Sequence, residues 1–167
     1  MEGLNAVDVA PGDSFYIPAG TVHALGKGVL VAEIQQNSDT TYRLYDYDRP
    51  GLDGKPRELH IEDSLNVISY TNEGASRMKT PLERPHTWLT LARSPYFIVE
   101  KGKVSGSWTL STSLKTFTML IVVDGEGELA WADGQLEVHP GNTLLLPASL
   151  GSYTLKSADL TVLQGFL

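Results

Sequence analysis

The chain has 167 residues, of which 13 are Lys or Arg and 20 are Asp or Glu, for a formal net charge of −7. Binding to nucleic-acid phosphates requires a clustered basic face, so an acidic chain with scattered basic residues argues against a nucleic-acid partner. The absence of cysteine excludes disulfides, thiolate zinc sites and cysteine nucleophiles, so any metal must bind through His, Asp, Glu or amides.

Strand signals dominate the chain. Short runs of β-branched, aromatic and leucine residues, separated by Gly, Pro and Asp turns, predict strands. These runs lie at 6–9, 14–17, 29–34, 96–101, 107–111, 116–123, 127–131, 143–146 and 160–163. This density of short strands predicts an all-β sandwich or barrel.

Other signals are few. Residues 61–65 predict one short helical turn, residues 38–59 a long polar loop and residues 71–85 a polar linker. The first residues lack a basic and apolar leader, and the longest apolar stretch, 119–123, is far too short to cross a bilayer. We therefore expect a cytoplasmic protein with no membrane partner.

An internal repeat indicates the domain organisation. Residues 7–19 (VDVAPGDSFYIPA) match residues 136–148 (LEVHPGNTLLLPA) at a constant offset of 129 residues, and the register holds without a gap to Gln35 and Gln164. The second copy has about forty residues of strand-like sequence before it, and the first has six. A barrel needs such strands to pair its edges.

The repeat thus predicts a partial first barrel in residues 1–75 and a complete second barrel in residues 76–167. The exposed β edges of the partial barrel predict a homodimer, or pairing with a separately supplied N-terminal half.

The first copy continues into a histidine. Residues 11–23 (PGDSFYIPAGTVH) contain a Pro-Gly-Asp turn, a strand, a Pro-x-Gly turn and His23. This arrangement resembles the second cupin motif, which implies jelly-roll-type cupin modules with one imidazole aimed into the barrel. Histidine binds metals through either ring nitrogen. The second copy has Ser152 in place of His23 and is expected to be metal-free.

Residues 20–28 (GTVHALGKG) and 33–49 (EIQQNSDTTYRLYDYDR) extend the match. They closely resemble type I mannose-6-phosphate isomerases of the short bacterial form, most strongly over residues 7–70. The resemblance implies a zinc site in which His23 is one ligand, a catalytic Arg43 beside the sugar phosphate, and Glu33 facing the active site. The family's Gln-x-His ligand pair, its ligand glutamate and its phosphate-binding serine and lysine residues have no counterpart in this chain.

Each candidate also has a simpler explanation. His23 could be a core histidine bonded to a carbonyl, and Arg43 lies in a run of charges typical of solvated ion pairs. Strand alternation could place Glu33 on a solvent face.

The implied reaction interconverts mannose 6-phosphate and fructose 6-phosphate by zinc-assisted enediol proton transfer. With one ligand of four, we expect the chain alone to be inactive. The alternatives are a non-catalytic sugar-binding cupin and an assembly role.

Overall fold

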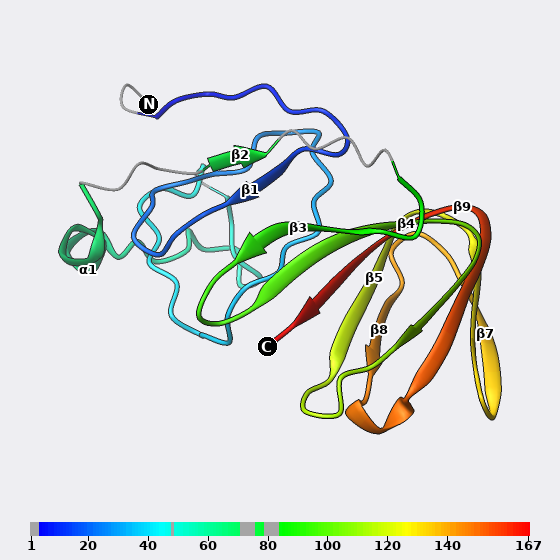
Figure 1. Cartoon of the computed structure of the whole chain (residues 1–167). Coiled ribbons are helices and arrows are strands. Elements are labelled where there is room, and N and C mark those ends of the chain that lie inside the picture. Colours follow the sequence, from blue (N-terminus) through cyan, green and yellow to red (C-terminus); the bar gives the residue numbers. More distant parts are fainter. Residues whose placement is uncertain (1–3, 48, 71–75, 79–83) are drawn as a thin grey trace. The chain divides into compact units, whose positions relative to one another are not determined.

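The computed structural model describes residues 4–47, 49–70, 76–78 and 84–167 (Figure 1). The chain divides into two compact units. The first unit comprises Met1–Val9, Phe15–Val29 and Asn37–Arg77, and the second comprises Ala10–Ser14, Leu30–Gln36 and Met78–Leu167. Within the described ranges, no helix is both long and apolar enough to span a bilayer.

The second unit contains one antiparallel sheet of seven strands. The strands and one 3-10 turn are, in chain order, β3 (Trp88–Arg93), β4 (Ile98–Ser111), β5 (Thr118–Gly125), β6 (Gly127–Trp131), β7 (Gly134–Val138), β8 (Thr143–Leu146), η1 (Ala148–Leu150) and β9 (Ser152–Phe166). The main path runs β3-β4-β9-β5-β8, while β6 pairs with β7 and β9. This is the all-β cupin arrangement that the sequence predicts.

Strand β9 organises the sheet. One edge of β9 pairs with β4 along its whole length, from Phe166 opposite Ile98 to Ser152 opposite Ser111. The other edge pairs first with β6 and then with β5. A single long strand, labelled β9 and coloured orange to red in Figure 1, therefore pairs with three neighbours.

A bulge keeps the apolar side chains of β9 on one face. Tyr153 and Leu155 are buried, and so are Leu160 and Val162, although five positions separate Leu155 from Leu160. Strict alternation would place the two pairs on opposite faces. Val104 of β4 pairs with Leu160, but Gly106, two residues on, pairs with Ser157, three residues away in β9. Strand β9 therefore has one extra residue here, and this residue restores the common face.

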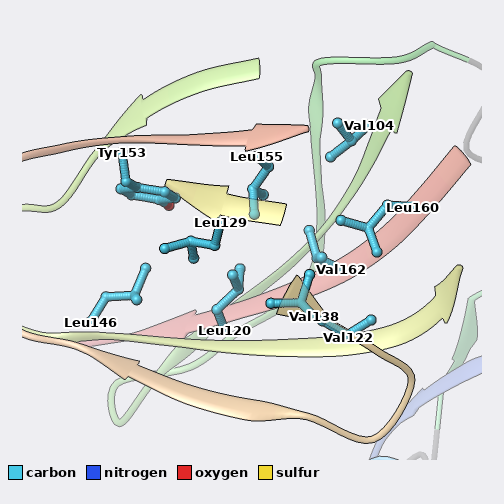
Figure 2. Packing of buried hydrophobic residues seen from close by; sticks show 10 residues of the cluster. All are labelled: Val104, Leu120, Val122, Leu129, Val138, Leu146, Tyr153, Leu155, Leu160 and Val162. Atoms are coloured by element: carbon cyan, nitrogen blue, oxygen red, sulfur yellow. The ribbon is translucent and has the colours of Figure 1, made fainter. Parts of the chain in front are cut away.

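The core of this unit forms between the faces that the strands present to one another (Figure 2). Its buried members are Val104, Leu120, Val122, Leu129, Val138, Leu146, Tyr153, Leu155, Leu160 and Val162. They come from six strands, so burial of their apolar surface ties the sheet together.

The repeat produces the same local structure twice. In the first copy Asp13 N–H donates to Ala10 O at 3.1 Å, and in the second Asn142 N–H donates to His139 O at 3.0 Å. Both side chains also accept from the backbone N–H three residues earlier. The glycines of both Pro-Gly turns have positive φ, which residues with a Cβ adopt only with strain.

The first unit has less regular structure. Strand β1 (Ser14–Tyr16) and strand β2 (Ser76–Met78), of which all residues but Ser14 and Met78 belong to this unit, form a two-stranded sheet, and α1 spans Ile61–Val67. Ser69 N–H donates to Gly20 O at 3.0 Å, which attaches the end of α1 to the Pro-x-Gly turn. A Cβ on Gly20 would lie 2.7 Å from Val67 O, so this close approach requires glycine.

Several expected strands differ from the observed ones. Residues 6–9 and 29–34 form no strand, because a strand needs a hydrogen-bonded neighbour and these residues pair with none in the described structure. The two strands expected at 96–101 and 107–111 are one continuous β4. Strands β2, β3 and β7 were not predicted, and the rest of the expected 71–85 linker lies mostly outside the described residues.

Candidate functional site

Arg43 is held by the segment that leads into α1. Its backbone N–H donates to His60 Nδ1 at 3.2 Å, and its carbonyl accepts from His60 N–H at 2.8 Å. Its guanidinium donates from Nη1 to Glu58 O at 3.1 Å. The side chain stays 25% exposed. Arg43 is therefore anchored at both backbone and side chain while part of its side chain remains accessible.

A buried carboxylate lies next to this arginine. Asp46 is only 6% exposed and lies within salt-bridge distance of three guanidinium groups. Arg57 Nε donates to Oδ2 at 2.6 Å and Arg57 Nη2 donates to Oδ1. Arg49 Nη2 donates to Oδ1 at 2.9 Å, and Arg43 Nε lies 3.7 Å from Oδ1. One negative charge thus lies within 4 Å of three positive ones.

Arg57 is the strongest partner of this carboxylate. The pKa of Asp46 falls from 3.8 to about 2, first because Arg57 donates hydrogen bonds to its ionised form and then because Arg49 does; desolvation opposes both. The same hydrogen bonding raises the pKa of Arg57. A bidentate guanidinium–carboxylate pair combines charge with fixed geometry, so this contact sets the shape of the loop.

His23 lies in the same unit as Arg43 and is exposed. Its Nδ1 is 2.9 Å from the Thr21 carbonyl, a contact in which Nδ1 must carry the proton. The Nε2 lone pair is then free to bind a metal, which is the usual tautomer of a ligating histidine with a carbonyl partner. Its place on the exposed surface argues against a core histidine.

Glu33 belongs to the other unit, in the segment Leu30–Gln36, and is exposed. Two of the three expected site residues thus belong to the first unit and the third to the second unit. In the part of the chain that the structure describes, no three His, Asp or Glu side chains converge closely enough to hold a metal ion. His23 fits as one zinc ligand, but the described residues supply no complete zinc site.

Sequence reasoning missed the supporting residues Asp46, Arg57 and His60. The spacing Arg43-Asp46-Arg49 indicated ion pairs but could not show that the central carboxylate is buried. Arg57 lies eleven residues beyond Asp46, across a turn closed by the Gly51 N–H and the Lys55 carbonyl at 2.7 Å. Such a contact has no sequence signature, because it depends on the course of an irregular loop.

A shallow polar hollow lies on the second unit, lined by Glu126, Gly127, Glu128, Glu137, His139 and Lys156. Lys156 Nζ is 2.8 Å from Glu128 Oε1. His139 lies 3.5 Å from Glu126 and 4.0 Å from Glu137, and all three side chains are at least half exposed. Exposed ion pairs of this kind contribute little to stability and do not by themselves make a site.

Comparison with known proteins decides the family. Residues 87–163 match the family model described as mannose-6-phosphate isomerase, cupin domain. Over 157 residues the chain is 45% identical to mannose-6-phosphate isomerase ManA of Bacillus subtilis, an alignment that covers 93% of this chain and 49% of that protein. The chain belongs to the mannose-6-phosphate isomerase family.

Further relatives agree with this assignment. The mannose-6-phosphate isomerase of Streptococcus mutans is 37% identical over 158 residues, covering 90% of this chain and 47% of that protein. The crystal structure of the Bacillus subtilis mannose-6-phosphate isomerase superposes with a TM-score of 0.66 at 30% identity, covering 79% of this chain and 42% of that one. The chain thus spans about half the length of the curated relatives it matches.

Proposed function

We propose that this chain supplies part of a mannose-6-phosphate isomerase, which interconverts mannose 6-phosphate and fructose 6-phosphate in the cytoplasm. The observation that carries the proposal is the geometry of Arg43. Its guanidinium, which is always cationic, is anchored by the Glu58 carbonyl, and the side chain as a whole remains 25% exposed. The substrate expected from the isomerase family is a sugar phosphate, whose negative charge complements this cation.

The reaction moves a proton between C1 and C2 of the sugar through an enediol. Negative charge develops on the two sugar oxygens, and a cation already fixed in place stabilises it without reorganisation. We assign that role to Arg43. Glu33 is the second residue to which we assign a catalytic role, because an ionised acid can accept a proton or orient a sugar hydroxyl.

Zinc is the proposed metal of the complete enzyme, with His23 as one of its ligands through Nε2. When bound, zinc supplies Lewis-acid polarisation of the sugar oxygens. The ligand set must be completed from outside the described residues, since these hold no group of three candidate ligands. We therefore expect the chain alone to bind zinc weakly and to lack turnover.

The proposal is tested by comparing the chain with a chimeric protein in which it replaces the matching half of Bacillus subtilis ManA. Zinc content and conversion of mannose 6-phosphate to fructose 6-phosphate are measured on both. We expect neither zinc nor turnover from the chain alone, and both from the chimera. The variants His23→Ala and Arg43→Lys should reduce turnover, His23→Ala with loss of zinc and Arg43→Lys without it.

Matched controls separate these roles from general damage. His139→Ala removes an exposed histidine of the second unit, and Arg93→Ala removes an exposed arginine at the end of β3. Both should leave zinc content and turnover unchanged. A chimera that holds zinc and keeps full turnover with Arg43→Lys would contradict the role of Arg43. Zinc retained in His23→Ala would contradict metal ligation.

The exposed apolar residues of the first repeat support the predicted assembly through β edges. Val9 and Val31 are nearly half exposed, whereas their equivalents in the second repeat, Val138 and Leu160, are fully buried in the sheet. Exposed strand-forming segments of this kind pair readily with another chain. Sedimentation of the chain alone should reveal a dimer, and a strict monomer at high concentration would refute self-association.

A further inference from the structure

Arg43 depends for its position on a short segment that follows it in the loop. The Glu58 carbonyl accepts from its guanidinium, and His60 exchanges two hydrogen bonds with its backbone. Residues 58–60 thus form the segment to which Arg43 is hydrogen-bonded. Any contact that fixes this segment also fixes the direction of the arginine side chain.

Arg57 immediately precedes residues 58–60 and makes a bidentate contact with Asp46. Both carboxylate oxygens of Asp46 accept hydrogen bonds from Arg57, and the carboxylate itself is buried. Arg49 also reaches Asp46, but through only one carboxylate oxygen and the Asp46 backbone carbonyl, and 61% of its side chain is exposed, against 39% for Arg57. Arg57 is therefore the partner whose loss would release the loop.

We propose that Asp46 and Arg57 form a clip that positions Arg43 by holding residues 58–60 against it. The clip acts on Arg43 through residues 58–60 and through the direct approach of Asp46 Oδ1 to Arg43 Nε at 3.7 Å, so Asp46 and Arg57 are positioning residues. Its contribution to catalysis rests on the proposed function, in which Arg43 is the catalytic cation. The clip itself is a property of this chain and can be measured without turnover.

The first test uses nuclear magnetic resonance of the arginine side chains in the ¹⁵N-labelled chain. The Nε–Hε signal of Arg43 is assigned by its disappearance in Arg43→Lys. In Arg57→Ala we expect this signal to move toward the position of exposed arginines and to exchange faster with water. Lys55→Ala removes another exposed cation of the same loop and should leave the Arg43 signal unchanged.

Two further variants guard against a trivial loss of folding. Arg57→Lys keeps the charge but cannot make the bidentate contact, so it should release Arg43 while the backbone amide signals of α1 keep their positions. Arg49→Ala should perturb Arg43 less than Arg57→Lys does. An Arg43 signal unchanged in both Arg57 variants would overturn the clip, and so would equal effects of Arg49→Ala and Arg57→Lys.

The second test uses turnover of the chimeric enzyme. A small displacement of a catalytic group typically lowers the rate by about 10–100-fold, so Arg57→Lys should reduce kcat on that scale with little change in KM. A released Arg43 with unchanged kcat would retain the clip as a structural device and remove Arg43 from the proposed mechanism. An unchanged Arg43 signal with reduced kcat would refute the clip and leave the proposed function standing.

Discussion

Two glycines of the second unit separate backbone strain from steric overlap. Gly125 ends β5 with φ of 77°, and Gly141 lies in the Pro-Gly turn with φ of 89°. A Cβ at Gly141 meets nothing within 4 Å, whereas a Cβ at Gly125 would overlap the Asp159 carbonyl and lie 3.0 Å from Leu160 Cα. The obstacle at Gly125 is backbone of the long strand β9, which cannot rotate away.

The expected magnitudes follow from this difference. Holding an alanine at positive φ costs about 1–2 kcal/mol, which is the whole effect expected for Gly141→Ala. Overpacking adds about 1–3 kcal/mol, so Gly125→Ala should destabilise the unit by about 2–5 kcal/mol. Both variants place an alanine at positive φ, so the difference between their free energies of unfolding measures the overlap with β9.

Urea unfolding followed by tryptophan fluorescence measures both values. All three tryptophans, Trp88, Trp108 and Trp131, belong to the second unit, so their signal reports the unfolding of this unit alone. Equal free energies of unfolding for Gly125→Ala and Gly141→Ala would refute the reasoning. A Gly141→Ala variant less stable than Gly125→Ala would refute it more strongly.

Three further predictions concern buried polar groups. Burial raises the pKa of Tyr153 from 10.0 to about 12, so the stability present below pH 10 should decline as the pH rises toward 12, and Tyr153→Phe should abolish that decline. The lowered pKa of Asp46 predicts a contribution present above pH 3.8 and lost as the pH falls toward 2, which an acid titration of its carboxyl signal would follow. Thr112 Oγ1 donates to the Ala148 carbonyl and accepts from Gly151 N–H, both at 3.0 Å, so Thr112→Val should cost about 1–3 kcal/mol in urea unfolding and Thr112→Ser less.

The second unit was largely predictable from its sequence. The strands at 127–131 and 143–146 were predicted with their observed bounds, because Gly and Pro turns mark both ends. The repeat also correctly related the turn at Ala10–Asp13 to the turn at His139–Asn142. The merging of two expected strands into β4 was not predictable, since glycines such as Gly102 and Gly106 usually interrupt strands. Gly102 is instead required because a Cβ there would lie 2.6 Å from the Trp88 ring.

The first unit shows where sequence reasoning fails. Residues 29–34 have strand-forming composition but remain unpaired within the described structure, because a strand also depends on a partner that its own sequence does not encode. The motif around Arg43 made this arginine a candidate site residue, yet the contacts that support it come from Asp46, Arg57 and His60 in an irregular loop. Tertiary contacts of this kind lie beyond local pattern analysis.

The position of β9 in the chain has a consequence for biosynthesis. This strand joins β4, β5 and β6, all of which precede it in the sequence and leave the ribosome earlier. Until β9 emerges, each of these strands has an open edge, and pairing must wait for a contact of long sequence separation. We expect nascent chains that end before residue 152 to be captured by chaperones or to aggregate, and the second unit to acquire protease resistance only after synthesis of β9.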